Sequence, residues 1–167
     1  MAVTHAILPI MRKQRSGHVF NISSVAGLKG GFGASIYSAS KFAVEGFSQA
    51  IAEELRPLGI HVTCVSPGFF RTDFLDSNSI KYTEKSIDDY AQPVAEFRKF
   101  FANRNHQQAG DPQKLAQVLL KLAEYEKPPV SFVAGTDAVQ WATGVINTLQ
   151  EQVNTHKDLS ESTDGNW

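Results

Sequence analysis

Two side chains four residues apart, Tyr37 and Lys41, are the most informative chemical feature of this sequence. Residues with this spacing on a helix share a face and rise about 6 Å along its axis, so an ammonium group can lie beside a phenol. A free tyrosine has a pKa of about 10, and a neighbouring cation favours its phenolate form. The pair therefore predicts a general acid/base, Tyr37, assisted by Lys41.

Two other runs lie at fixed distances from this pair. The first is Asn-Ile-Ser-Ser-Val-Ala-Gly at positions 21–27, which reads as a strand end and places Ser24 thirteen positions before Tyr37. The second is Pro-Gly-Phe-Phe-Arg-Thr at positions 67–72, which follows another predicted strand and begins thirty positions beyond the tyrosine. Taken alone, each has an ordinary interpretation, because serines terminate strands, Lys41 fits a solvated helix face and Thr72 fits a helix N-cap.

Together, the three motifs resemble the catalytic and C-terminal part of the short-chain dehydrogenase/reductase family, whose Asn-x-Ser-Ser-x-Ala-Gly, Tyr-Ser-Ala-Ser-Lys and Pro-Gly-x-x-x-Thr motifs occur in this order. The resemblance implies an NAD(P)-dependent oxidoreductase that interconverts an alcohol and a ketone or aldehyde by hydride transfer. It implies that Tyr37 transfers the proton, that Lys41 assists it, and that Ser24 holds the carbonyl oxygen. A carbonyl that accepts hydride develops negative charge, which such groups stabilise.

The resemblance also implies a set of contacts to NAD or NADP. Lys41 would hydrogen-bond the ribose hydroxyls, and the Pro-Gly turn would let the backbone approach the nicotinamide. The Phe70 amide and the Thr72 hydroxyl would bind the carboxamide. The implied cofactor-binding residues are Tyr37, Lys41, Pro67, Gly68, Phe70 and Thr72.

The glycine-rich turn with which this family holds the pyrophosphate is absent from the 167 residues. Gly27, Gly30, Gly31 and Gly33 follow a different strand, and we expect them to form a flexible loop above the site. The positions that choose between NAD and NADP are absent too, so the choice stays open. Residues 5–13 resemble the end of the family's preceding helix, so we expect a chain that begins in mid-helix, as a fragment or a natural remnant.

Two functions from different classes therefore stay open. One is an oxidoreductase that is active within a complete fold. The other is a noncatalytic fragment that keeps a helix-mediated association surface, because Ala39, Ala43, Gly46 and Ala50 allow close packing along the 36–56 helix. The resemblance implies that this helix forms a homo-oligomer contact.

The apolar pattern predicts strands at 18–22, 60–65 and 130–133, alternating with helices. This order predicts an α/β fold, the C-terminal part of a Rossmann-type doubly wound parallel sheet with three layers. Asp111 and Thr136 are expected to cap the two helices after the second strand. We expect a partial domain over 1–155 and a polar, disordered tail over 156–167, with strand 18–22 as an exposed edge that makes the chain marginally stable or aggregation-prone.

The segment 74–108 is rich in aromatic residues, and in similar enzymes this region forms a helical lid over the substrate. The spacing of Phe97 and Phe101 favours a packed helix face over a ligand cage. If some of these rings face the pocket, with Phe69 and Phe70 at its floor, the substrate is bulky and apolar.

Composition bears on the partners, the compartment, and the presence of a metal site or membrane span. A formal net charge of −1 gives no sign of a nucleic-acid partner. The single cysteine, Cys64, lies in an apolar strand, which predicts a buried, reduced thiol and a cytoplasmic protein. The five histidines show no ligand spacing, and no apolar stretch is long enough for a membrane span, so we predict neither a metal site nor a span.

Overall fold

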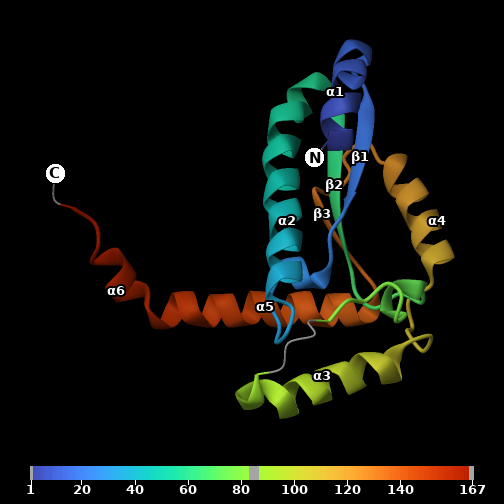
Figure 1. Cartoon of the computed structure of the whole chain (residues 1–167). Coiled ribbons are helices and arrows are strands. Elements are labelled where there is room, and N and C mark those ends of the chain that lie inside the picture. The colour runs from blue at the N-terminus through green and yellow to red at the C-terminus, as the bar shows by residue number, and fades with distance from the viewer. Residues whose placement is uncertain (1, 83–86, 166–167) are drawn as a thin grey trace.

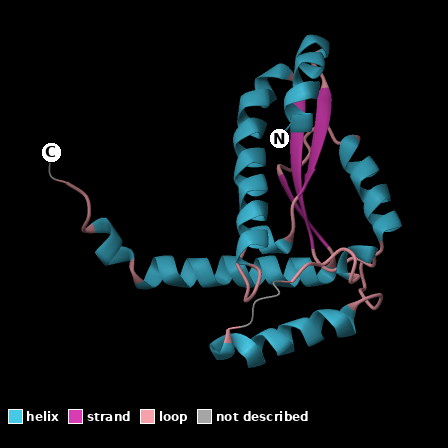
Figure 2. Cartoon of the chain, in the orientation of Figure 1, coloured by secondary structure: helices cyan, strands magenta, loops and turns pink. Residues whose placement is uncertain are grey.

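A parallel three-stranded sheet surrounded by helices forms the body of the computed structural model, which describes residues 2–82 and 87–165 (Figures 1 and 2). The strands are β1 (Gly17–Ile22), β2 (Ile60–Pro67) and β3 (Ser131–Ala134), in the spatial order β1-β2-β3. Both neighbouring pairs are parallel. The α-helices are α1 (Ala2–Gln14), α2 (Ser35–Leu55), α3 (Ala91–Arg104), α4 (Pro112–Ala123), α5 (Thr136–Thr155) and α6 (Lys157–Glu161). The predicted α/β fold with a parallel sheet is confirmed.

The main core lies between α2 and the central strand β2. Ile51, Ala52 and Leu55 of α2 pack against Ile60 and Val62 of β2. Side chains from α1, β1 and the segment before β3 complete this core. The strand is buried almost throughout because helices cover both faces of a parallel sheet, which explains its nearly continuous apolar sequence.

The helix ends follow local sequence signals in two places. The Asp111 carboxylate accepts hydrogen bonds from the backbone N–H groups of Gln113 and Lys114, so the predicted N-cap of α4 is confirmed. A 3₁₀ turn over Arg56–Leu58 continues α2, and Gly59, with φ of 71°, ends it in the left-handed region that favours glycine.

The expected cap of the last long helix was wrong. Thr136 is the first residue of α5, and the N-cap is Gly135, whose φ of 102° suits glycine. The segment expected to be disordered contains the short helix α6, in which Lys157 and Glu161 lie 3.7 Å apart at a spacing that supports a helix. The domain boundary at 155/156 and the disordered tail remain predictions.

Strand β1 lies at one edge of the sheet, as predicted, and pairs with β2. At the carboxyl ends of the strands the chain leaves the sheet for short turns, and α3 lies below that end (Figure 1). No helix in residues 2–82 and 87–165 has the length and apolar character needed to cross a membrane.

Candidate active site

The three sequence motifs meet at the carboxyl ends of β1 and β2. Because these strands are parallel and in register, Ser24 follows β1 at the same edge of the sheet where Pro67 ends β2. Helix α2 begins at Ser35, so Tyr37 lies in its first turn. The carboxyl edge of a parallel sheet is where ligands bind in open α/β folds.

Tyr37 and Lys41 lie side by side on α2, as their spacing predicted. The Lys41 Nζ atom is 5.7 Å from the centroid of the Tyr37 ring and donates a 3.0 Å hydrogen bond to the Ile22 carbonyl oxygen at the end of β1. Burial lowers the pKa of the Lys41 ammonium, and a Coulombic interaction with Cys64 opposes this shift. The Tyr37 side chain is exposed, so its phenol is accessible to a ligand.

The loop that carries Ser23 and Ser24 contacts α2 at Lys41. The buried Ser23 hydroxyl donates to the Lys41 carbonyl oxygen at 3.2 Å. A Cβ atom at Gly27 would lie 2.9 Å from the same oxygen, so only glycine allows this close approach. The Ser24 hydroxyl accepts from the Ala26 N–H at 3.2 Å and caps the 3₁₀ turn over Val25–Gly27. Its predicted contact with a substrate carbonyl remains a prediction.

The Pro-Gly turn is held by an aspartate that sequence reasoning missed. The Asp137 carboxylate, in the first turn of α5, accepts a 2.7 Å hydrogen bond from the Phe69 N–H. The same carboxylate fills the space that a Cβ at Gly68 would need. The Gly68 N–H donates to the Ala134 carbonyl oxygen at 2.9 Å. Glycine at position 68 is therefore required by the fold itself.

Thr72 and Phe70 also have structural contacts. The Thr72 hydroxyl accepts from the Phe74 N–H at 3.3 Å and caps the 3₁₀ turn over Asp73–Leu75. Phe70 pairs with Gly110 in an isolated parallel bridge. The N-cap interpretation of Thr72 is thus observed, whereas the carboxamide contacts of both residues remain predictions.

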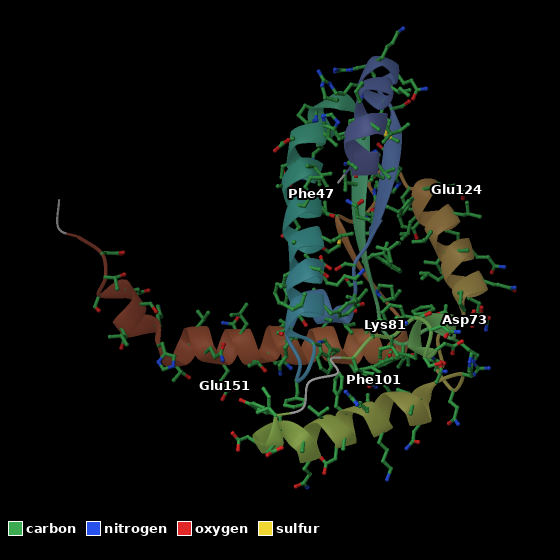
Figure 3. The ribbon with its side chains drawn as sticks, in the orientation of Figure 1. Phe47, Asp73, Lys81, Phe101, Glu124 and Glu151 are labelled. Carbon is green, nitrogen blue, oxygen red and sulfur yellow. The ribbon has the colours of Figure 1, made fainter. Side chains whose placement is uncertain are left out.

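An aromatic cluster links α3 to the loops of the site. The rings of Phe97 and Phe101 contact each other, with centroids 4.7 Å apart, and Phe101 also contacts Phe69, at 6.1 Å. Phe97 reaches the glycine-containing loop, where it lies 6.1 Å from Phe32 and 3.3 Å from the position of a Cβ on Gly33. These contacts agree with the packing interpretation, and Figure 3 labels Phe101 on this helix.

Phe74 lies beside the predicted acid/base. Its ring centroid is 6.0 Å from that of Tyr37, and its side chain is 59% exposed. The next residue, Leu75, is buried, so the turn is anchored while Phe74 faces outward. An apolar surface therefore adjoins the phenol.

A buried polar network below the site was not predicted. Glu45 follows Lys41 by four residues on α2 and is only 5% exposed; its Oε1 accepts a hydrogen bond from the Ser66 hydroxyl. Asn21 of β1 donates to the Ser48 hydroxyl at 2.9 Å. Burial raises the pKa of the neighbouring Cys64 thiol to about 12. The spacing from Tyr37 through Lys41 to Glu45 was the signal that could have revealed this shared face.

The structure also brings Asp73, Asp76 and His106 together on the surface, with one ligand atom from each within 4.8 Å of the others. Sequence spacing does not indicate this grouping, because His106 lies thirty residues beyond Asp76 in the chain. Asp76 Oδ1 accepts from Asn105 Nδ2 at 2.7 Å and lies 3.0 Å from His106 Nε2. The grouping is thus held by its own hydrogen bonds.

The parallel sheet, with a tyrosine-lysine helix at its carboxyl edge, defines an α/β protein of the Rossmann type. The family model for short chain dehydrogenases matches residues 1–83, which contain all three motifs. The chain belongs to the short-chain dehydrogenase/reductase family.

Individual comparisons agree with this assignment. The chain is 40% identical over 130 residues to 3-ketodihydrosphingosine reductase of Bacteroides thetaiotaomicron, covering 78% of this chain and 48% of the relative. A short-chain dehydrogenase structure from Streptomyces avermitilis matches with a TM-score of 0.86 and 36% identity, over 97% of this chain and 58% of that one. The structure of ElxO with NADP bound matches with a TM-score of 0.53 and 26% identity, over 78% and 49%. The chain spans about half the length of the curated relatives it matches.

Proposed function

We propose that this chain supplies the acid/base half of an NAD(P)-dependent oxidoreductase that interconverts an alcohol and a ketone or aldehyde. The observation that carries the proposal is the placement of the Lys41 ammonium 5.7 Å from the Tyr37 ring, at the carboxyl edge of the sheet. In this arrangement Tyr37 donates a proton to the carbonyl oxygen, or takes one from the alcohol, while the Lys41 charge favours the phenolate. Ser24, which follows β1 at the same edge, hydrogen-bonds that oxygen.

The residues present fit a nicotinamide cofactor. The Lys41 ammonium has three N–H donors, and the contact with Ile22 uses one, so it can also bind ribose hydroxyls. Pro67, Gly68, Phe70 and Thr72 line the adjacent turn at the end of β2. When bound, the dinucleotide supplies or accepts the hydride. The NADP-bound state of the similar ElxO structure supports this assignment, and both NAD and NADP stay candidates.

The proposed substrate is apolar. The exposed ring of Phe74 adjoins Tyr37, and Phe32 and Phe100 are also about half exposed near the same loops. The relative named 3-ketodihydrosphingosine reductase also supports an apolar substrate. We therefore propose a bulky, apolar alcohol or ketone.

Two further features belong to the proposal. Residues 36–56 form a homo-oligomer contact through the small side chains of α2; a Cβ at Gly46 would meet no other atom within 4 Å. The buried, free thiol of Cys64 supports a cytoplasmic location.

The alternative, a noncatalytic association fragment, is less well supported, because the acid/base residue types are retained and the relatives are named as oxidoreductases and reductases.

Titration of the chain with NADH and NADPH, followed by nicotinamide fluorescence, tests the cofactor assignment. Turnover of an apolar ketone then tests the chemistry. Tyr37→Phe keeps the ring and is expected to reduce turnover by about 100-fold or more, because positioned proton transfer contributes at least that much. Tyr125→Phe makes the same change at an exposed position outside the site and should leave turnover unaltered. Wild-type turnover in Tyr37→Phe would refute the assignment of Tyr37, whereas absence of both binding and turnover would favour the noncatalytic alternative for this chain.

The substrate class needs its own test. Phe74→Ala should raise KM for long-chain ketones more than for small polar ones, because it removes apolar surface beside the phenol. Phe42→Ala, at a similarly exposed position on α2, is the matched control. Turnover of small polar ketones with none of apolar ones would overturn this assignment while leaving the oxidoreductase proposal intact.

A further inference from the structure

Helix α5 carries an apolar face that the described residues of the chain do not cover. At its start, Ala138 is fully buried, and this part of the helix contacts β3 and the 3₁₀ turn after β1. Figure 1 shows α5 running past the end of α2 and away from the sheet towards α6. Along this outward course, four apolar side chains are 51–66% exposed: Val139, Ile146, Leu149 and Val153. The face that is buried at the start of the helix thus continues into solvent.

These four residues, together with the half-buried Ala142, follow the spacing of a two-stranded helical seam. Val139, Ala142, Ile146, Leu149 and Val153 alternate by three and four residues. One set of positions is β-branched (Val, Ile, Val), and the other holds Ala and Leu. β-Branched residues at the first position of a heptad, with leucine at the fourth, favour pairs of helices. We call these five residues the α5 seam.

The borders of the α5 seam favour a second copy of the same chain over other partners. Glu151 is the only charged residue between Ala138 and Thr155, and it lies on the opposite side of the helix from the seam. The residues beside the seam include Thr143, Gln150 and Gln152, which are polar and uncharged. Two identical helices can therefore meet without placing like charges together.

Other partner classes fit this surface less well. A helix that binds a membrane surface carries lysine and arginine on its polar face, and a nucleic-acid surface needs basic residues to neutralise phosphates. From Ala138 to Thr155, α5 has no basic residue at all.

We propose that α5 is a self-association surface, on which the α5 seam packs against the same seam of a second copy around a two-fold axis. This surface is separate from the proposed contact through α2. It does not depend on catalytic activity, so its test is independent of the proposed function.

Sedimentation equilibrium of the 167-residue chain tests the proposal. Ile146→Asp places a charge in the middle of the seam in both copies, and we expect association to weaken by about 100-fold or more. Asn147→Asp adds the same charge one residue further along, about 100° around the helix and outside the seam, and should change association by less than about threefold. Far-ultraviolet circular dichroism establishes that both variants keep the fold.

Cross-linking provides a second, structural measurement. Cys64 is the only native cysteine and is fully buried, so a new surface thiol reacts without interference. Under mild oxidation, Ile146→Cys should form a disulfide-linked dimer, and Asn147→Cys should form much less. A wild-type chain that stays monomeric, or association that is unchanged by Ile146→Asp, would overturn the proposal. The latter result would assign self-association to α2 or to the open edge of β1.

Discussion

Replacing Ser66 with alanine is expected to destabilise the fold by about 2–3 kcal/mol, because it removes the donor to a buried carboxylate. Ser66 is 2% exposed and Glu45 is 5% exposed, so water cannot easily replace the lost contact. The Ser66 hydroxyl donates to Glu45 Oε1, while Oε2 has no hydrogen-bond partner within the described residues. A hydrogen bond to a charged group contributes about 1.5–3 kcal/mol, and the substitution deletes only one oxygen, so a cavity adds little.

The double-mutant cycle isolates this contact from its surroundings. Glu45→Met keeps a similar volume, removes the buried charge and leaves the Ser66 hydroxyl without its acceptor, at a cost of about 1–3 kcal/mol. In the double variant neither polar group remains, and replacing both partners by apolar groups can be nearly neutral. The single effects sum to about 3–6 kcal/mol, so we expect the double variant to be about 3 kcal/mol or more above the stability that additivity predicts.

Thermal and urea unfolding, monitored by circular dichroism, measure all four proteins of the cycle. For a chain of this length, about 1 kcal/mol changes Tm by about 2–4 °C, so Ser66→Ala should lower Tm by about 4–12 °C. Ser160→Ala, on the exposed helix α6, is the control and should change Tm by less than about 2 °C. Single effects that add within about 0.5 kcal/mol would refute the reasoning, since they would show that the two side chains do not interact.

Two other substitutions and one labelling experiment test separate parts of the fold. Burial, and then the charge of His61, lowers the pKa of His18 from 6.5. The neutral His18 ring therefore stabilises the fold above pH 6.5, and this contribution is lost as the pH falls through the lowered pKa. Urea unfolding should thus show less acid destabilisation in His18→Gln than in the wild type; equal pH profiles would contradict this. A pKa near 12 instead of 9.0 leaves Cys64 with about a thousandfold less thiolate than an unperturbed thiol near pH 8. Maleimide labelling of Cys64 should therefore require unfolding. Rapid labelling of the native chain would contradict the raised pKa. Asp111→Ala should cost about 1 kcal/mol in urea unfolding by removing the N-cap of α4, whereas Asp111→Asn should cost less; equal losses would show that the side-chain oxygen is not the stabilising group.

Local signals predicted the elements that position the site. The apolar run from Ile60 to Val65 needs helices on both faces, which is why a buried parallel strand was predictable from sequence. The Asp111-Pro112 pair predicts the start of α4 because the cap and the proline act within one turn of the chain. The spacing of Tyr37 and Lys41 fixed their common face before any tertiary contact was known.

Long-range contacts were not predictable in the same way. Asp137 accepts from the Phe69 N–H across 68 residues of sequence, and no local pattern connects the two. Glu45 was missed because a glutamate on a helix normally faces solvent; its spacing from Lys41 places it on the same face, but its burial depends on tertiary packing. Thr136 fits an N-cap by residue type, but the positive φ of Gly135 determines where α5 begins.

The same helix that carries the proposed acid/base is attached to both neighbouring strand ends. Ser23, after β1, donates to the Lys41 carbonyl oxygen, and Ser66, near the end of β2, donates to the Glu45 carboxylate one turn further along α2. Because each strand end continues directly into a site loop, these two buried contacts set the position of α2 relative to Ser24 and to the Pro-Gly turn. The geometry around Tyr37 therefore depends on serines that do not reach the phenol, which is why weakening either contact should disturb the site without removing any of its chemical groups.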